Sequence, residues 1–286
     1  MIRVILQGGL GNQMFEYAAA YAISRRVNQP IVLDMSFFEA YKGRDWCRPY
    51  ELDIFALHKK ATFIGGHKWE VKVLPKLAYR CRKNGIKHLG RYMFLPNESD
   101  KKDQVLFGYF PDYHLFEAYR EDLLQAFSFV TKPNEANEQL LKGIGACESV
   151  GVHIRRGDYL NNANAGVFWH PSVEWYRQAM ATLEQQVQPQ YYFFSDDIEW
   201  AKREFADVKN AHFVDVNHGK DAYNDLRLMS CCKHNIIANS TFSWWAAWLN
   251  INPAKVVIAP AKYYTNEVSN ERYLSQMILN GWLTIE

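Results

Sequence analysis

The sequence predicts an α/β protein made of two doubly wound, Rossmann-like domains that face each other across a cleft. At the N-terminus, a strand, a glycine-rich loop, a helix and a second strand follow one another. Strands and helices then alternate regularly through the second half of the chain. The length of 286 residues suits two domains, which we expect at residues 1–145 and 146–286.

The first domain begins with a short apolar strand at residues 3–6, followed by the glycine-rich loop at residues 7–13. Apolar residues then repeat at helical spacing from residue 14 to 23, and residues 31–33 form a second strand. This order of strand, loop, helix and strand begins a doubly wound domain.

The segment from about residue 40 to 105 is less regular, and we expect an irregular, partly helical insertion there. Basic residues far outnumber acidic ones between residues 58 and 102. Beyond the insertion, residues 105–110 have the apolar character of a strand and residues 119–127 that of a helix.

The second domain shows the alternation of strands and helices most clearly. Its expected strands cover residues 150–154, 191–194, 212–214, 235–238 and 256–258. Its expected helices cover residues 172–187, 198–205, 222–231, 242–249 and 271–279. Strands and helices at this spacing form a parallel sheet, and the carboxyl ends of its strands carry the binding loops.

Charge and cysteine content exclude several classes of protein. A formal net charge of +2 is too small to indicate a nucleic-acid-binding protein. The five cysteines are odd in number and lack metal-like spacing, which fits reduced thiols in a cytoplasm. The N-terminus reaches its glycines too early for a signal peptide, and no apolar run has the length of a membrane span. We therefore expect a cytoplasmic protein.

The loop at residues 7–13 resembles part of a dinucleotide-binding fingerprint. Met14 occupies the position of the third glycine, where its side chain blocks close packing of helix on strand, and this disfavours an NAD(P) site. The loop still lets backbone approach a ligand at a helix N-terminus, where Asn12 and Gln13 offer hydrogen-bonding groups. A tight turn without a ligand is the alternative.

Residues 153–158 (His-Ile-Arg-Arg-Gly-Asp) stand at the end of an expected strand. His153 and Arg155 point to one side of that strand and leave the sheet together, toward the cleft. The guanidinium group of Arg155 carries a permanent charge and a fork of donors that matches phosphate oxygens. The alternative is a surface cluster in which Arg155, Arg156 and Asp158 form ion pairs.

Asp196 and Asp197 follow another strand and begin a helix. Paired carboxylates suggest a metal site, but a contiguous pair at this place fits helix capping better. We expect one of the two to cap the helix, and the other to contact ribose hydroxyls or an arginine.

Hydroxyl side chains surround the start of the helix expected at residues 242–249. The backbone N–H groups of that helix start, together with Ser240, Thr241 and Ser243, form an anion site. Simple capping of the helix by Ser240 or Thr241 is the alternative, and both roles can hold at once.

Four stretches of the chain together resemble the bacterial α-1,2-fucosyltransferase family. They are residues 8–15, 153–159, 194–197 and 235–245, and they follow the family order along nearly the whole chain. The resemblance implies the two-domain GT-B fold, GDP-β-L-fucose as donor, inversion to an α-linked product, and no cofactor or metal ion.

The resemblance also implies roles for individual residues. Arg155 would lie on the donor pyrophosphate and Ser243 on a phosphate. Asp225 is the nearest match to an aspartate that recognises guanine, and Asn12 matches an asparagine near the reacting centre. The rest of the expected donor-binding set is His153, Arg156, Asp197, Ser240 and Thr241.

The attacking hydroxyl group needs a proton acceptor, for which Asp158 and Asp112 are the candidates. The family usually reads Gln-Ser where this chain has Pro111 and Asp112. We expect this region to face the acceptor, so this departure from the family pattern bears on which acceptor glycan is used.

We therefore expect transfer of L-fucose from GDP-fucose to the 2-hydroxyl of a terminal galactose on a glycan acceptor, during surface-polysaccharide synthesis. Arg155 and the helix start at residues 240–243 would stabilise the negative charge that develops on the β-phosphate. The alternatives are a transferase for another GDP-sugar, an NAD(P)-dependent oxidoreductase and a non-catalytic glycan-binding protein.

The basic segment between Trp69 and Arg91 suggests a further partner. Trp69, Val73 and Leu77 share one helical face, which Pro75 interrupts. Such a segment suits the anionic inner face of a membrane, where a lipid-linked acceptor would be found. A solvated surface or an insertion that recognises the acceptor is the alternative.

Overall fold

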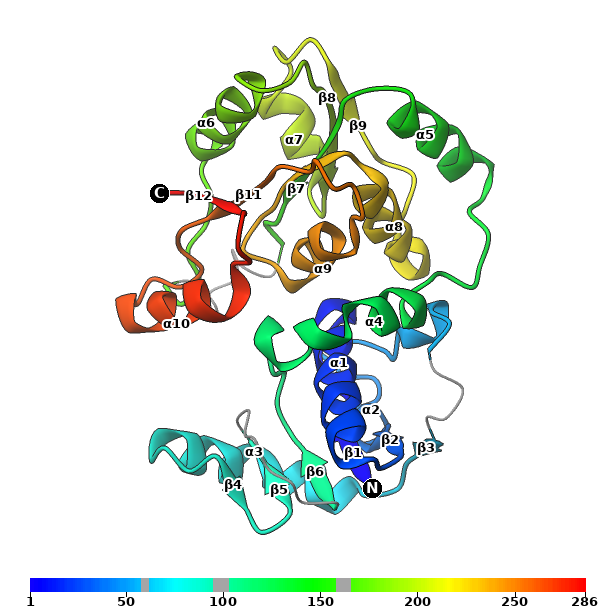
Figure 1. The fold of residues 1–286 in the computed structure, drawn as a ribbon, viewed down its shortest axis with the longest axis vertical. Coiled ribbons are helices and arrows are strands. Elements are labelled where there is room, and N and C mark those ends of the chain that lie inside the picture. The colour runs from blue at the N-terminus through cyan, green and yellow to red at the C-terminus, as the bar shows by residue number, and fades with distance from the viewer. Residues whose placement is uncertain (58–61, 95–102, 158–165) are drawn as a thin grey trace. The chain divides into compact units, whose positions relative to one another are not determined.

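The computed structural model describes residues 1–57, 62–94, 103–157 and 166–286 (Figure 1). The chain divides into two compact units, residues 1–131 and 132–286. The division falls earlier than the boundary expected between residues 145 and 146. Helix α5 (Glu135–Gly145), which we did not anticipate, belongs to the second unit.

The first unit is built on a six-stranded sheet in the order β3-β2-β1-β6-β5-β4. Its pairings are parallel, apart from that of β4 with β5. The strands are β1 (Ile2–Ile5), β2 (Ile31–Asp34), β3 (Thr62–Ile64), β4 (His88–Leu89), β5 (Tyr92–Met93) and β6 (Gln104–Leu106). The chain builds outward from β1 on one side and continues on the other side of it, so a topological switch point lies between β1 and β6.

Four α-helices and three short 3₁₀ helices accompany this sheet in the described part of the unit. The α-helices are α1 (Leu10–Val27), α2 (Ser36–Ala40), α3 (Lys68–Lys83) and α4 (Arg120–Ala126). The 3₁₀ helices are η1 (Leu52–Ile54), η2 (Tyr113–Leu115) and η3 (Glu117–Tyr119). Helix α1 is buried on nearly every side and ends at Asn28, which adopts the left-handed conformation common at helix ends.

Helix α3 is more regular than the irregular insertion expected for this part of the chain. It continues through Pro75, which has no N–H group to donate to the carbonyl of Val71 one turn earlier. The hydroxyl of Tyr41 donates to that carbonyl instead, at 3.4 Å. Trp69 and Val73 lie on the exposed side of the helix, at 64% and 55% relative exposure.

A buried ion network ties α3 to the sheet. The Arg3 guanidinium lies 3.0 Å from an oxygen of Asp34 and 2.6 Å from an oxygen of Glu70. Within the described ranges, Asp34, His67 and Glu70 are the one cluster whose ligand atoms lie close enough together to hold a metal ion. Because Arg3 already compensates both carboxylates, we interpret the cluster as a structural ion network.

The second unit has a parallel six-stranded sheet in the order β12-β11-β10-β7-β8-β9. The strands are β7 (Ser149–Ile154), β8 (Gln190–Ser195), β9 (Ala211–Phe213), β10 (His234–Ile236), β11 (Val257–Pro260) and β12 (Leu283–Ile285). This is the Rossmann strand order, with its switch point between β7 and β10. The alternation read from the sequence gave every strand except β12.

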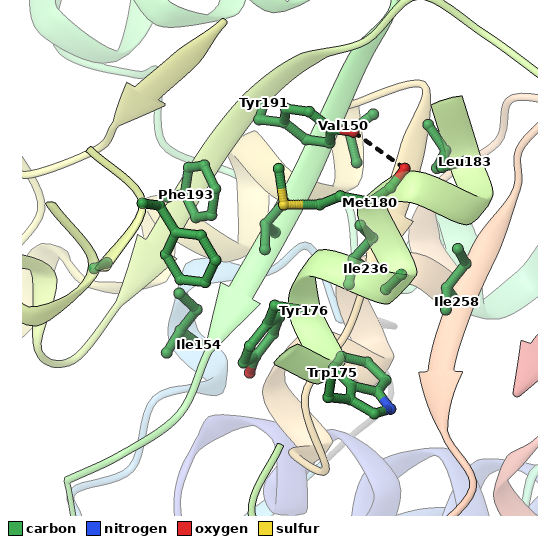
Figure 2. Close-up of a cluster of buried hydrophobic side chains, with 14 residues drawn as sticks. Val150, Ile154, Trp175, Tyr176, Met180, Leu183, Tyr191, Phe193, Ile236 and Ile258 are labelled. Atoms are coloured by element: carbon green, nitrogen blue, oxygen red, sulfur yellow. Dashed lines mark hydrogen bonds between the residues drawn. The ribbon is translucent and has the colours of Figure 1, made fainter. Parts of the chain in front are cut away.

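The helices of the second unit cover its sheet and close its core. Besides α5 they are α6 (Val173–Glu184), α7 (Ile198–Glu204), α8 (Tyr223–Cys231), α9 (Thr241–Leu249), α10 (Glu267–Met277) and the 3₁₀ helix η5 (Gly219–Asp221). Figure 2 shows Trp175, Tyr176 and Met180 of α6 packed among Val150, Phe193 and other apolar side chains of the strands. In the described parts of the chain, no helix is both long and apolar enough to cross a bilayer.

Candidate functional site

The switch point of the second unit gathers most of the residues singled out in the sequence. Arg155 and Arg156 follow β7, and Asp196 and Asp197 follow β8. Ser240 lies just beyond β10 and begins α9. Because these strands are parallel, their carboxyl ends share one edge of the sheet, where ligands of such folds bind.

Asp196 organises the loop after β7. Its Oδ2 lies 2.9 Å from Nη1 of Arg155. Its two oxygens also accept hydrogen bonds from the backbone N–H groups of Arg156 (2.9 Å) and Gly157 (3.1 Å). The side chains of Arg155 and Asp196 remain 24% and 26% exposed. The carboxylate therefore orients the Arg155 guanidinium while leaving it accessible to a ligand.

Gly157 makes this arrangement possible because the Asp196 carboxylate lies where a side chain at this position would begin. A β-carbon added to Gly157 would lie 2.5 Å from Oδ2 of Asp196, well inside van der Waals contact. Any larger residue at this position would push Asp196 away from the loop and disturb the orientation of Arg155.

Arg156 is anchored within its own unit. Its Nε donates to Oδ2 of Asp197 at 3.2 Å, and its guanidinium lies 4.0 Å from the ring centroid of Trp200. Asp197 is also the N-cap of α7 and accepts from the backbone N–H of Trp200. The sequence left open which aspartate caps the helix; the structure gives this role to Asp197 and an arginine contact to both.

His153, the last but one residue of β7, is an uncharged group at neutral pH. Burial lowers its pKa to about 4, with the Asp196 charge opposing the shift and the Arg155 charge adding to it. Its Nδ1 is buried and has no hydrogen-bond partner among the described residues. A buried neutral imidazole beside Arg155 can donate or accept one hydrogen bond without adding charge.

The start of α9 combines capping with a helix N-terminus. The Ser240 hydroxyl accepts from the N–H of Phe242 at 3.3 Å, so the capping role is present. The hydroxyl of Ser243 is fully buried and donates to the carbonyls of Ala238 (3.5 Å) and Ser240 (3.4 Å). A phosphate contact by Ser243 stays a prediction, and it requires this hydroxyl to leave its local acceptors. Thr241 is partly exposed at the first position of the helix.

Asp225 lies in the first turn of α8, after the loop that leaves β9. Burial is the main cause that raises its pKa to about 7, although a hydrogen bond from Asn217 works in the other direction. Asn217 donates to Asp225 at 2.8 Å and exchanges two further hydrogen bonds with the buried Asn137, at 2.8 and 2.9 Å. This network presents one carboxyl group at the ligand edge of the sheet.

Asn12, the remaining expected residue that the structure describes, lies in the first unit. It stands in the first turn of α1, after the glycine loop. Gly8 has a φ of +73°, and a β-carbon there would lie 2.8 Å from Nδ2 of Asn12 and 3.0 Å from Cε1 of Tyr109. The loop glycine thus lets the side chains of Asn12 and Tyr109 lie close against its backbone.

Gln13, which we also considered for ligand binding, has a structural role. Its Nε2 donates to the carbonyls of Gly8 (2.9 Å) and Pro49 (2.8 Å), and its Oε1 accepts from the N–H of Glu51 (3.0 Å). The side chain is fully buried, so it ties the glycine loop to the segment at residues 49–51.

Of the two candidate proton acceptors, Asp158 and Asp112, the structure describes Asp112. Asp158 lies outside the described residues. Asp112 caps η2, where its Oδ1 accepts from the N–H of His114 and lies 2.9 Å from the Nδ1 of the same histidine. The Asp112 carboxylate is therefore already engaged locally.

Two contributors, Asn137 and Asn217, were missed in the sequence, and the hold of Asp196 on the backbone of the arginine loop was missed as well. Asp196 fixes the arginine loop, and Asn137 and Asn217 hold Asp225. Asp196 lies 39 positions from Gly157 and Asn137 lies 80 positions from Asn217, so no local sequence pattern indicates these contacts. The contiguous aspartate pair after a strand was the one available signal, and it marked the position without separating the two roles.

The sequence profile described as glycosyl transferase family 11 matches residues 89–286. Two Escherichia coli proteins are each 34% identical to the chain. The O-antigen biosynthesis glycosyltransferase WbnK aligns over 98% of this chain and 99% of its own length. The alpha-1,2-colitosyltransferase aligns over 93% of both. Galactoside alpha-(1,2)-fucosyltransferase 2 of Hylobates lar is 26% identical over 85% of this chain and 67% of its own length.

Among solved structures, the fucosyltransferase NodZ from Bradyrhizobium superposes with a TM-score of 0.57 at 12% identity. The superposition covers 86% of this chain and 91% of NodZ. NodZ is a GT-B enzyme, and the likeness in fold confirms the predicted fold class of two Rossmann-like sheets.

Proposed function

The chain belongs to glycosyl transferase family 11, and on that premise we propose that this glycosyltransferase moves L-fucose from GDP-β-L-fucose to the 2-hydroxyl of a terminal galactose. In the proposed reaction the bond between the anomeric carbon and the β-phosphate oxygen breaks and GDP leaves. The acceptor oxygen bonds to the opposite face of the anomeric carbon, and its proton passes to a base. The product is then α-linked, in a glycan of the kind that O-antigen relatives build.

The observation that carries this proposal is Arg155, held by Asp196 at the switch point of the second sheet. Negative charge develops on the β-phosphate as the bond to the sugar breaks. A guanidinium fork oriented in advance stabilises that charge without reorganising. The backbone N–H groups at the start of α9 lie at the same sheet edge, and the helix N-terminus adds to the effect.

We assign the base end of the donor to Asp225. Guanine offers two neighbouring N–H donors, which an ionised carboxylate accepts side by side. Asn217 and Asn137 hold the carboxyl group in place, and its pKa near 7 means that it ionises fully only above neutral pH. His153, Arg156, Asp197 and the hydroxyls of Ser240, Thr241 and Ser243 complete the proposed donor site.

We further propose that the transfer needs no divalent cation. Asp196 accepts from Arg155 and two backbone groups, and Asp197 accepts from Arg156 and caps α7. A cation on this pair would have to displace both arginines. The positive charge that a metal would bring to the pyrophosphate is supplied by Arg155 in this proposal.

For the acceptor side we propose Asn12 near the reacting centre and Asp158 as the proton acceptor. Asn12 stands directly after the glycine loop at the ligand edge of the first sheet. Asp112 is the weaker candidate for the base because its carboxylate is engaged with His114.

A second donor is favoured by one relative, the alpha-1,2-colitosyltransferase at 34% identity. Colitose is L-fucose without the 3-hydroxyl, so the two sugars differ by one group. The rival proposal is a GDP-colitose-dependent transferase with the same linkage.

One assay tests these proposals together. The protein is incubated in EDTA with lactose and either GDP-fucose or GDP-colitose, and GDP release and the trisaccharide are measured. We expect α-1,2-fucosyl-lactose in EDTA. A preference for GDP-colitose moves the conclusion to the rival, and a requirement for Mg²⁺ overturns the metal-independent step.

We also propose that the exposed side of α3 contacts the anionic inner face of a membrane. This helix exposes Trp69 and a set of cations, and its one acidic residue, Glu70, is buried against Arg3. The exposed cations of α3 are Lys68, Lys72, Lys76, Arg80, Arg82 and Lys83. Each cation near an anionic surface contributes about 1 kcal/mol, and an exposed tryptophan suits the headgroup region.

Vesicle sedimentation tests this contact. Wild type should sediment with phosphatidylglycerol vesicles and not with phosphatidylcholine vesicles. The double substitution Lys72→Glu and Lys76→Glu should reduce the bound fraction at least tenfold. The matched pair Lys142→Glu and Lys209→Glu, on exposed positions of the second unit, serves as control. Equal losses in both pairs would contradict a surface localised to α3.

A further inference from the structure

The first unit contains a pocket whose lining includes none of the residues proposed above to bind the donor or to take part in the transfer. Its volume is about 540 Å³, within the size range of small-molecule sites. It lies at the carboxyl edge of the first sheet, where Gln7 follows β1 and Phe107 to Tyr109 follow β6. Strands β1 and β6 flank the switch point of this sheet, so the pocket lies where doubly wound sheets bind ligands.

One wall of the pocket is aromatic. Phe37, Tyr41 and Trp46 line it and contact one another, with ring centroids of Trp46 at 5.0 Å from Tyr41 and 6.3 Å from Phe37. Despite these ring contacts, Trp46 is 61% exposed, which is unusual for a tryptophan. Exposed aromatic faces of this kind suit the apolar face of a sugar ring.

The aromatic wall is fixed by α3. Pro75 lines the pocket, and its missing N–H group leaves the carbonyl of Val71 for the hydroxyl of Tyr41. The proline and the tyrosine thus form one rigid piece of the wall, which favours a preformed site.

The pocket also contains a basic residue, Arg82, which lies on α3 like Pro75. Among the described residues that line the pocket, Arg82 is the single charged one. Its Nη1 lies 3.6 Å from the place of a β-carbon on Gly108, so the guanidinium lies over the loop that follows β6. Its positive charge also acts on Tyr109, where it opposes the rise in pKa that burial and Glu16 cause.

The charged residue in the lining predicts the charge of the ligand. Arginine and the tryptophan N–H group only donate hydrogen bonds, and no carboxylate is found in the described lining. A neutral sugar needs acceptors for its hydroxyl protons. The amide of Gln7 and the hydroxyls of Tyr41 and Tyr109 can provide such acceptors, so hydrogen bonding alone does not select the charge of the ligand. The charge type in the described lining does: the guanidinium of Arg82 matches a carboxylate or phosphate.

The pocket adjoins the residue proposed to lie near the reacting centre. Tyr109 lines the pocket and comes within 3.0 Å of the place of a β-carbon on Gly8, where Asn12 lies at 2.8 Å. A sugar in the pocket would therefore be a near neighbour of the proposed attacking hydroxyl.

We infer that this pocket binds an acidic part of the acceptor glycan, a carboxylate or phosphate carried by the sugar next to the galactose, with Arg82 on the anion and Trp46 against the ring. The inference rests on the proposed function and deepens it, because it assigns the class of acceptor. Arg82 and Trp46 then determine specificity and take no part in bond breaking.

Three acceptors test the inference. Lactose, the analogue with glucuronate in place of glucose, and lactose 1-phosphate all present the same galactose but differ in charge on the second sugar. We expect kcat/KM of wild type to be at least tenfold higher for one or both anionic acceptors, and the better of the two identifies carboxylate or phosphate. Equal kcat/KM for all three overturns the inference.

Variants locate the effect. Arg82→Ala should abolish the preference for the anionic acceptor, mainly through KM, and Arg82→Lys should restore part of it. Arg80→Ala removes the same charge from the same helix outside the pocket and should keep the preference. A preference that Arg82→Ala leaves intact, or that Arg80→Ala also removes, contradicts the assignment.

A binding measurement separates this inference from the proposed transfer. Calorimetric titration of the whole protein with the glucuronate disaccharide and with lactose 1-phosphate needs no donor and no turnover. If either anion binds wild type but not Arg82→Ala while no fucosyl transfer occurs, the pocket assignment stands and the proposed function fails. If both anions bind the two proteins equally, or neither binds wild type, the pocket assignment fails whatever the transfer assay shows.

Discussion

The two switch points of the molecule occupy the same place in their sheets, but one is lined mainly by charged side chains and the other mainly by aromatic ones. In the second unit the strand ends bear two arginines and two aspartates joined by short ion pairs. In the first unit the strand ends border an aromatic pocket with Arg82 as its charged lining residue. Topology therefore selects where a ligand binds, and the loop residues select which ligand.

The difference also shows in how each edge is held. The charged edge is fixed by side chains distant in sequence, such as Asp196 on the loop at Arg155. The aromatic edge is fixed by backbone exceptions, namely Gly8 with positive φ and Pro75 inside a helix. A charged site needs its groups oriented in advance, whereas an aromatic wall needs space and close approach.

The largest effect is expected from removing the oriented cation of the second unit. Arg155→Ala should lower kcat by roughly 10²–10³-fold or more, because it removes a donor to the developing phosphate charge. Arg155→Lys should recover little, since an ammonium group lacks the fork. Transfer assays and thermal unfolding are measured together, with Arg203→Ala on the surface as control. A near-normal rate in Arg155→Ala would remove the pyrophosphate role.

The second prediction concerns the pH dependence of GDP binding, which we expect to depend on Asp225 in the second unit. With a pKa of about 7, its ionised fraction rises about tenfold between pH 6 and 8, and the affinity for GDP should rise by a similar factor. Asp225→Asn should bind GDP weakly and lose this part of the pH dependence, while the part due to the phosphate remains. Calorimetric titration at several pH values gives both. An unchanged pH profile in Asp225→Asn would exclude guanine recognition by this carboxyl group.

The same group affects stability with a defined sign. Its folded pKa is raised above the unfolded value near 4, so the folded state binds the proton more tightly between about pH 4 and 7. The contribution of Asp225 to stability is therefore lost as pH rises through that window. Asp225→Asn keeps a neutral side chain in the site, and its Tm should exceed that of wild type at pH 8 and match it near pH 4.

A substitution at Gly8 tests the switch point of the first unit, and the same substitution at Gly43 is the control. Gly8 and Gly43 both have positive φ, at +73° and +80°, but a β-carbon on Gly43 would meet nothing within 4 Å. Gly43→Ala should cost about 1–2 kcal/mol of unfolding free energy from backbone strain alone. Gly8→Ala should cost more, because its methyl group displaces Asn12 and Tyr109. It should raise the acceptor KM and leave GDP affinity unchanged. Equal behaviour of the two variants would show that the approach at Gly8 is unimportant.

Much of this organisation was predictable from local sequence. The period of apolar residues gave the strands of the second sheet, and polar residues after β7, β8 and β10 marked its ligand edge. The pattern failed for α3, because Pro75 suggested an interruption that Tyr41 in fact compensates. It also missed β12, a short strand with two exposed residues, which lacks the buried apolar run that identifies the others.

The candidate site was predictable in its positions more than in its contacts. The arginines after β7 were found because a strand fed directly into them. The hydrogen bonds of Asp196 with the loop after β7 and of Asn137 with Asn217 depend on segments that only the folded sheet brings together. The pocket of the first unit was not anticipated, because Trp46, Arg82 and Tyr109 come from three segments without a shared pattern.

The smallest expected effect concerns Arg156, for which the sequence and the structure suggest different roles. Trp200→Leu removes the ring that lies 4.0 Å from the guanidinium and should cost about 0.5–2 kcal/mol of unfolding free energy. A double-mutant cycle with Arg156→Ala, measured by chemical denaturation, isolates this coupling. If Arg156 is mainly a structural anchor, the cycle shows coupling of that size and GDP affinity changes less than about threefold, below 1 kcal/mol. If Arg156 binds the donor, Arg156→Ala weakens GDP far more than Trp200→Leu does. In that case the ligand edge of the second unit carries two arginines that face the donor, Arg155 and Arg156, whereas the aromatic pocket of the first unit carries one arginine, Arg82.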